Sequence, residues 1–172
     1  MTLMIKTAEE LIDPELEARW ARRRADRQSE VLWHIWRAFL THGGPIPVEA
    51  IERAFTGRSA EAVRDTLVWL DEHDLVLLQD GHVRLAYPFS GAPTAFSVTL
   101  PAGAERFACC AIDALGIAPM LGHRIEIRAR CHHCGTPLLF SADTAGPGPD
   151  ADGVMVWVGR RGPDERRVCT GY

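Results

Sequence analysis

The spacing of apolar residues changes partway along the chain, and this change constrains the fold more than any other feature. Residues 29–40 carry apolar side chains at helical intervals: Val31, Leu32, Ile35, Trp36, Phe39 and Leu40. This helix is predicted to end at residues 41–45, where two glycines and a proline follow one another. Residues 95–100 instead alternate apolar and polar side chains, as half-buried strands do. The chain is therefore predicted to combine a helical region with a β-sheet.

Two further helices and a hairpin are predicted after the first helix. The second helix is expected over residues 47–55, and the third from the N-cap Ser59 to about His73. Asp80-Gly81 is a strong hairpin signal between two β-prone runs, at residues 75–78 and 82–86. Three helices and a hairpin resemble a winged helix-turn-helix, so residues 29–88 are predicted to form a winged-helix-like domain.

The third helix of this domain is poorly suited to reading DNA. Base recognition in the major groove requires Arg, Lys, Asn or Gln, and Arg64 is the one such residue expected there. Its acidic neighbours repel phosphate: Glu61, Asp65, Asp71, Glu72 and Asp74. A structural winged helix is thus favoured over a nucleic-acid partner.

Residues 87–93 contain two prolines and a glycine and are predicted to separate the winged-helix-like domain from a second one. The elements expected beyond this boundary are strands at 95–100, 123–130, 137–141 and 154–158, a helix at 104–115, a bend at 116–122 and a final segment at 166–172. The predicted division is an N-terminal helical segment (1–28), the winged-helix-like domain (29–88) and a cysteine-bearing domain (94–172). The fold class is α+β, with the helical lobe packed on a small mixed or antiparallel sheet that carries a cysteine-bearing helix.

Charge and cysteine content limit the environment and the partners. The net charge of −4 gives no overall attraction to phosphate or anionic lipid. No stretch approaches the roughly 18 apolar residues of a membrane span, so a cytoplasmic protein without a membrane partner is expected. Five cysteines, an odd number, then indicate reduced thiols used for metal or catalysis rather than a set of disulfides.

Cys110 and Asp113 are the sharpest local feature. On the predicted helix, a separation of three residues places the thiol and the carboxyl on one face. This arrangement suits a nucleophile and a proton donor. The structural alternative is that Cys110 is buried as a small apolar side chain while Asp113 faces water.

A longer pattern carries a family resemblance. It runs Phe107-Ala-Cys-Cys110-Ala-Ile-Asp113-Ala-Leu-Gly116-Ile-Ala-Pro119-Met-Leu-Gly122, followed by Cys131, Gly135-Thr136-Pro137 and a late Cys169. This order and spacing resemble the organomercurial (alkylmercury) lyase family, from about residue 29 to the end and most strongly from Phe107 to Pro137. The resemblance implies that residues 94–172 are a catalytic, metal-binding domain and that the winged-helix-like region does not read DNA.

The resemblance also implies roles for individual residues. Cys110 would be the first thiolate on mercury, Cys169 the second, and Asp113 the acid that protonates carbon. Soft thiolates are the ligands that a soft cation such as Hg(II) prefers. A carboxyl group serves as this acid only if burial or a neighbouring negative charge raises its pKa. The reaction would need no organic cofactor, would leave Hg(II) bound as product, and would pass it to small thiols or a mercuric reductase.

The remaining cysteines leave alternatives open. Cys131 falls where the family has a structural cysteine, and with Cys134 it forms a C-x-x-C motif resembling half of a zinc site, although a structural zinc needs four ligands. The other interpretation is a turn with exposed histidines. Cys109 is assigned to core packing, and Trp157 and Phe140 are candidates for the wall of an apolar pocket.

Three functions are therefore weighed. The first is an organomercurial lyase acting on an organomercurial small molecule. The second is a noncatalytic thiolate protein that binds Hg, Cu or Zn on the same scaffold. The third, a metal-responsive winged-helix regulator, is disfavoured by the acidic third helix. Asp113 separates the first two, because a binder needs only the thiols.

Overall fold

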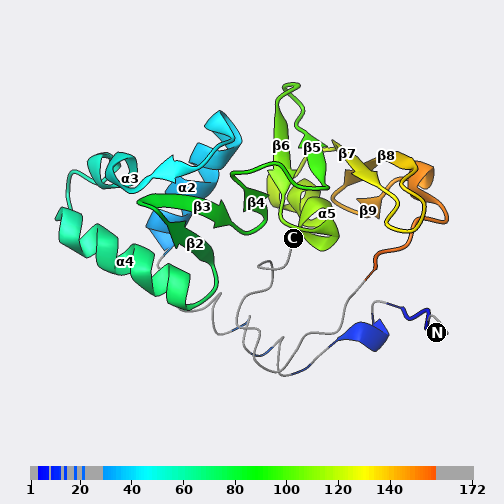
Figure 1. Cartoon of the computed structure of the whole chain (residues 1–172), viewed down its shortest axis with the longest axis horizontal. Helices are drawn as coiled ribbons and strands as arrows, with labels where there is room; N and C mark the ends of the chain where they lie inside the picture. Colours follow the sequence, from blue (N-terminus) through cyan, green and yellow to red (C-terminus); the bar gives the residue numbers. More distant parts are fainter. Residues whose placement is uncertain are drawn as a thin grey trace.

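The computed structural model describes residues 4–7, 9–12, 14, 18, 21 and 29–157. The predicted helical segment over residues 1–28 falls largely outside this set, and its described part includes one 3-10 turn, η1 (Glu9–Leu11). Residues 158–172, and with them Cys169, also lie outside the described residues. Figure 1 shows the described elements in order along the chain.

The helical region forms as the apolar spacing predicts. Its helices are α2 (Ser29–His42), α3 (Val48–Ala54) and α4 (Ala60–Glu72). Ser59 caps α4, since its side chain accepts a hydrogen bond from the backbone N–H of Ala62 at 3.1 Å. The apolar faces of these helices enter a common core that includes Val31, Ile35, Phe39, Ile51, Val63, Leu67 and Leu70.

The predicted hairpin is also present. It consists of β2 (Val76–Gln79) and β3 (His82–Ala86), which pair antiparallel. Asp80 and Gly81 both have positive φ, 52° and 72°, as a tight hairpin turn requires. The edge of β3 opposite β2 pairs with the short strand β1 (Ile46–Pro47).

One sheet runs through the whole described fold. Beyond β3 it continues with β4 (Phe89–Ser90), β6 (Glu105–Ala108), β5 (Ser97–Thr99), β7 (Ile125–Arg130), β8 (Pro137–Asp143) and β9 (Gly146–Pro147), with the 3-10 turn η2 (Pro149–Ala151) after β9. Its pairings are antiparallel. Together with α2 to α5, the four α-helices of the described residues, it forms a mixed α+β fold.

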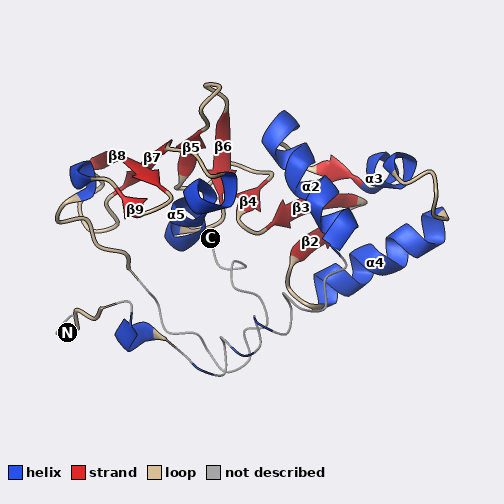
Figure 2. Ribbon diagram, turned by 180° about the vertical axis from the view of Figure 1, so that it is seen from behind, coloured by secondary structure: helices blue, strands red, loops and turns tan. Residues whose placement is uncertain are grey.

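The two regions on either side of residues 87–93 are joined rather than separated by that segment (Figure 2). Strand β4 lies within it and pairs with β3 on one side and β6 on the other. The Phe39 and Phe89 rings stack with centroids 6.2 Å apart, and Trp36 Nε1 donates to the Tyr87 carbonyl at 2.8 Å. The proline-rich boundary is therefore a structural junction.

Arg106 provides a second connection. Its Nε donates to the carbonyl of Leu40 at 3.0 Å and one terminal nitrogen donates to the carbonyl of Thr41 at 3.0 Å. These carbonyls belong to the last turn of α2, where backbone acceptors lack partners and the helix dipole favours a cation. Strand β6 is thereby fixed to the end of α2.

The predicted helix over residues 104–115 is wrong in its bounds. Residues 105–108 form β6, because Pro101-Ala102-Gly103 turns the chain back so that Val98 pairs with Arg106 beside it. The helix is α5 (Ala111–Leu121), so the predicted bend at 116–122 is mostly helix. Pro119 is tolerated in its final turns, and α5 ends at Gly122, whose φ of 69° suits glycine.

The strand predicted over residues 154–158 is also not found. Residues 154–157 have no regular structure, and their side chains Met155 and Trp157 are exposed. No neighbouring strand pairs with them in the described part of the chain. The β propensity of residues 154–157 is therefore not supported by a paired strand in the described part of the chain.

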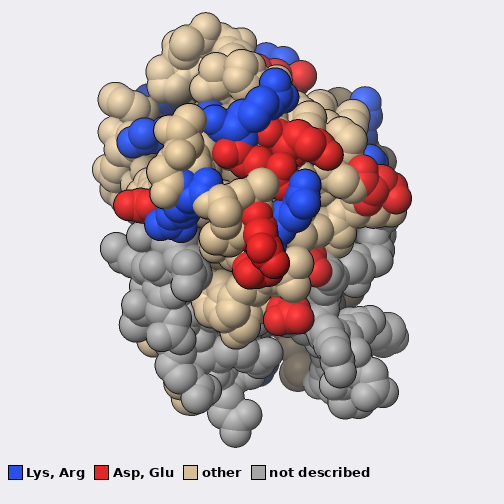
Figure 3. Space-filling view, turned by 90° about the vertical axis from the view of Figure 1, so that its left-hand side faces the viewer, with Lys and Arg blue, Asp and Glu red and all other residues tan. Residues whose placement is uncertain are grey.

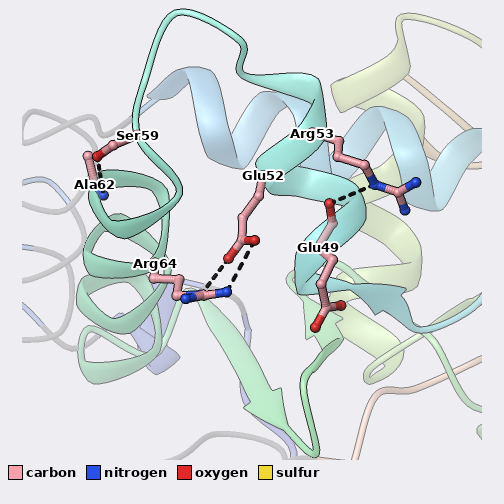
Figure 4. A network of polar contacts seen from close by, with 6 residues as sticks. All are labelled: Glu49, Glu52, Arg53, Ser59, Ala62 and Arg64. Atoms are coloured by element: carbon pink, nitrogen blue, oxygen red, sulfur yellow. Dashed lines mark hydrogen bonds and ion pairs between the residues drawn. The ribbon is translucent and has the colours of Figure 1, made fainter.

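The surface at the α3 and α4 end carries interspersed acidic and basic side chains rather than one basic patch (Figure 3). Arg64, the one base-reading candidate on the third helix, forms an ion pair with Glu52 of α3 (Figure 4). Its charge is thus compensated within the protein. Separately, none of the described helices has the length and apolar content needed to cross a bilayer.

Candidate functional site

Cys110 lies at the junction between β6 and α5. It is the N-cap residue of α5, with extended backbone angles of φ −151° and ψ −179°, and its carbonyl accepts the Ala114 N–H at 3.0 Å. A helix N-terminus presents unpaired N–H groups and the positive end of the helix dipole. The helix dipole therefore favours a negatively charged side chain at this position.

The backbone around Cys110 is held on both sides. Thr94 Oγ1 donates to the Ala108 carbonyl at 2.6 Å, and the Cys109 N–H donates to the Pro88 carbonyl at 3.1 Å. The Cys109 side chain is 5% exposed, which agrees with its assignment to core packing. Cys110 itself is half-buried. The thiol is thus presented from a firmly anchored strand end.

Asp113 meets Cys110 directly. The Cys110 Sγ donates to Asp113 Oδ2 at 3.0 Å, and the Asp113 side chain belongs to the first turn of α5. These residues were expected to be close as neighbours on a helix face. Instead, Cys110 is the N-cap residue and Asp113 the third residue of the helix, two positions whose side chains commonly form hydrogen bonds at a helix start.

Asp113 is held in its protonated form at neutral pH. The pKa of its carboxyl group is raised from 3.8 to about 8, chiefly by burial and also by the charge and the thiol hydrogen bond of Cys110. A backbone hydrogen bond from Cys110 opposes this shift. A carboxylic acid with such a pKa can both keep and release a proton near neutral pH, which is the property required of a general acid.

Cys131 and Cys134 lie in the loop between β7 and β8. Cys131 is half-buried, Cys134 is exposed, and both thiols are free. Cys134 Sγ lies 3.1 Å from Thr136 Oγ1. Hydrogen bonds from the Thr136 side chain, its backbone and the Cys131 side chain lower the pKa of the Cys134 thiol.

The described residues do not assemble a conventional zinc site. They contain no group of three or more His, Cys, Asp or Glu side chains suited to a metal ion. His132 turns instead toward Trp157, with their rings stacked at a centroid distance of 6.3 Å. Structural zinc sites have four ligands, so the C-x-x-C motif supplies only half of one here.

Among the described residues, the predicted aromatic pocket is not formed around Cys110. Phe140 lines a shallow depression with Arg124, Ser141 and Asp150, and neither Trp157 nor Cys110 is among the residues that line it. Trp157 is 60% exposed. The two aromatic side chains therefore do not enclose one apolar cavity in the described structure.

The sequence did not reveal the residues that support the thiols of Cys110 and Cys134. Thr94 holds the strand before Cys110, Thr136 bonds to Cys134, and Arg106 fixes β6 to α2. Thr136 could have been noticed from its place two residues after a cysteine. Thr94 and Arg106 act through contacts distant in sequence, for which the sequence carries no local signal.

Comparisons with known proteins find similarity to alkylmercury lyases. Residues 89–171 match the family described as MerB, alkylmercury lyase. An alkylmercury lyase of Staphylococcus epidermidis is 32% identical over 104 residues, which cover 60% of this chain. The chain spans 46% of that relative's length, a little under half.

A solved structure has a similar fold. The crystal structure of the mercury-bound form of MerB2 matches with a TM-score of 0.62 at 20% sequence identity, covering 79% of this chain and 66% of that one. The fold and the Cys110–Asp113 pair thus define a cysteine-based protein built on a mixed α+β scaffold. Residues 89–171 of this chain are thus similar to the alkylmercury lyase family.

Proposed function

We propose that the protein is an organomercurial lyase that breaks the carbon–mercury bond by protonolysis. The observation that carries this proposal is the thiol–carboxyl pair at the start of α5, with Cys110 Sγ 3.0 Å from Asp113 Oδ2. The thiol is the soft ligand that mercury prefers. The carboxyl group, with its pKa raised to about 8, holds the proton that the reaction consumes.

The reaction begins with capture of the organomercurial at Cys110. The thiol loses its proton, its sulfur bonds to mercury, and the original counter-ligand of the R–Hg group departs with that proton. A second thiolate then joins mercury, for which we propose Cys169, a residue outside the described part of the chain. This second donor raises the electron density on the carbon attached to mercury.

Asp113 completes the reaction. Its proton moves to carbon while the electron pair of the carbon–mercury bond becomes the new carbon–hydrogen bond. The hydrocarbon leaves, mercury remains as Hg(II) on two sulfurs, and Asp113 is left as a carboxylate that is reprotonated from solvent. We propose that small thiols or a mercuric reductase then accept the Hg(II), and that the reaction uses no organic cofactor.

We further infer that residues 29–88 serve as a winged-helix-like scaffold rather than as a DNA reader. The compensation of Arg64 by Glu52 supports this proposal, as do the mixed charges at the α3 and α4 end. The contacts of Arg106 and Trp36 with the sheet region give these helices a supporting role for the strand that precedes Cys110.

The proposed function is tested by incubating the reduced protein with methylmercury or phenylmercury and measuring methane or benzene in the headspace. We expect hydrocarbon from the parent protein and none above background from Cys110→Ser. Cys109→Ala is the matched control, because it removes the adjacent buried thiol and should retain hydrocarbon release.

The noncatalytic alternative has a different outcome in the same experiment. A thiolate-binding protein would hold mercury through Cys110 and release no hydrocarbon from either compound. Mercury bound tightly by a parent protein that yields no hydrocarbon would therefore replace the lyase proposal with the binding proposal.

A further inference from the structure

The loop between β7 and β8 is a second place where two thiols meet on an ordered backbone. The strands pair from Ile125 with Ala142 to Arg130 with Pro137, so the loop is the closed end of a long hairpin. Within it, the Cys131 N–H donates to the Thr136 carbonyl at 2.8 Å and the Gly135 N–H donates to the Cys131 carbonyl at 2.8 Å. Gly135 has a φ of 72°, which lets the chain turn tightly between the cysteines and the second strand.

The tight loop brings the two thiols near each other and beside a hydroxyl group. The Cys131 carbonyl accepts the N–H of Gly135, the residue after Cys134, and Cys134 Sγ lies 3.1 Å from Thr136 Oγ1. The Cys131 side chain contributes to the lowered pKa of the Cys134 thiol. Both cysteines are free, and Cys134 is exposed to solvent. The short loop therefore holds two sulfur donors close together where a ligand can reach them.

The donor set selects the kind of ligand. Zinc favours four tetrahedral ligands, and no third His, Cys, Asp or Glu donor joins this pair among the described residues. Two thiolates without further donors suit a soft cation that is satisfied by two ligands, of which Hg(II) is the strongest case. The exposed His132 and His133 are not needed for such a complex.

We propose that Cys131 and Cys134 form a second, solvent-accessible site that binds Hg(II) through two sulfurs, independently of the Cys110 site. On binding, each thiol gives its proton to solvent, two sulfur–mercury bonds form, and the water or chloride ligands of the ion leave. No oxidation or reduction is involved. The site goes beyond the proposed cleavage reaction, because it needs neither Cys110 nor Asp113.

The test uses the full chain with Cys110→Ser and Cys169→Ser, kept reduced and titrated with mercuric chloride in the presence of a small monothiol competitor. We expect this double variant to retain about one equivalent of Hg(II), because two linked thiols outcompete separate ones. Adding Cys134→Ser should weaken retention at least about tenfold. Adding His133→Ser, an exposed change in the same loop, is the matched control and should leave retention unchanged.

A second readout does not depend on any new substitution in the loop. In the double variant, bound Hg(II) should protect both Cys131 and Cys134 from maleimide labelling, as located by peptide mass spectrometry. Equal retention after Cys134→Ser, or protection of neither or only one of the two cysteines, overturns the proposal. Because Cys110 is absent throughout, a failure here is distinct from a failure of the lyase experiment.

Discussion

The thiols of Cys110 and Cys134 differ in the group that lies beside the sulfur. Cys110 lies at the half-buried junction of β6 and α5, and its partner is the carboxyl group of Asp113. Cys134 lies in an exposed hairpin loop, and its partner is the hydroxyl group of Thr136. A carboxyl group can supply a proton to a reacting carbon, whereas an alcohol beside a thiol mainly stabilises the thiolate.

The surroundings also shift the pKa values of the Asp113 carboxyl group and of the Cys134 thiol in opposite directions. Burial raises the pKa of Asp113 to about 8, and hydrogen bonding lowers the pKa of the Cys134 thiol. The first shift keeps a proton available in the site, and the second favours a charged sulfur ready to bind a cation. The comparison teaches that the group beside the cysteine, rather than the cysteine itself, distinguishes the proposed cleavage site from the proposed binding site.

The largest expected effect comes from removing the acid. Asp113→Asn keeps the size of the side chain but cannot deliver the proton, so hydrocarbon release should fall by on the order of 10² to 10⁴-fold. The measurement is the headspace rate from phenylmercury under saturating conditions. Mercury binding by the same variant is the control and should persist, because the thiols are intact. Full turnover by Asp113→Asn would remove the distinction between the two sites.

The pH dependence of the cleavage step gives the next largest effect. Asp113 is protonated below about pH 8 and loses its proton above it. In protein already loaded with the organomercurial, the single-turnover rate should fall about tenfold for each pH unit above that value. Rapid-quench measurements across the alkaline range will show this. A rate that stays constant or rises up to pH 10 would contradict the assignment of Asp113 as the proton donor.

Arg106 allows the support of the Cys110 site to be tested through stability. Arg106→Met removes the charged hydrogen bonds to the end of α2 and should lower the free energy of unfolding by about 1–3 kcal/mol. The control is Arg128→Met, which removes an exposed ion pair with Glu126 and should cost less than about 1 kcal/mol. Urea unfolding of both variants gives the comparison. Equal losses would show that Arg106 is no more than a surface charge.

The smallest expected effect concerns the hairpin loop. Thr136→Val removes the hydroxyl group that contributes most to lowering the pKa of Cys134, so that pKa should rise. Alkylation of Cys134 by iodoacetamide at neutral pH should then slow by about two- to fivefold, because the thiolate is the reactive form. Thr136→Ser keeps the hydroxyl group and should restore the parent rate. Unchanged alkylation in Thr136→Val would mean that the loop does not activate the thiol.

The sequence predicted the elements that local signals define. Helical spacing placed α2 and α4 to within a few residues, and Asp80-Gly81 marked the hairpin correctly. These signals are local: the apolar faces recur every three or four residues, and the turn needs positive φ at adjacent positions. The family resemblance likewise rested on residues close together in sequence, between Phe107 and Pro137.

The errors arose where the structure depends on contacts between residues that are not adjacent in sequence, such as strand pairing. Residues 105–108 were predicted to be helical, but pairing of Arg106 with Val98 makes them a strand. Cys110 and Asp113 were correctly predicted to lie close together, yet for a different reason, because α5 begins at residue 111. The burial that raises the pKa of Asp113 depends on how α5 packs against the sheet, which no spacing in the sequence reveals.

The pairing of strand β4 bears on whether the chain can be cut into fragments at the start of the matched region. The region that matches the alkylmercury lyase family begins at Phe89, the first residue of β4, although β4 is paired with β3 of the preceding region. A fragment starting there would present an unpaired strand edge, which invites association with other chains. The start of the matched region thus falls within a hydrogen-bonded part of the sheet, and dividing the chain there would remove the β3 partner of β4.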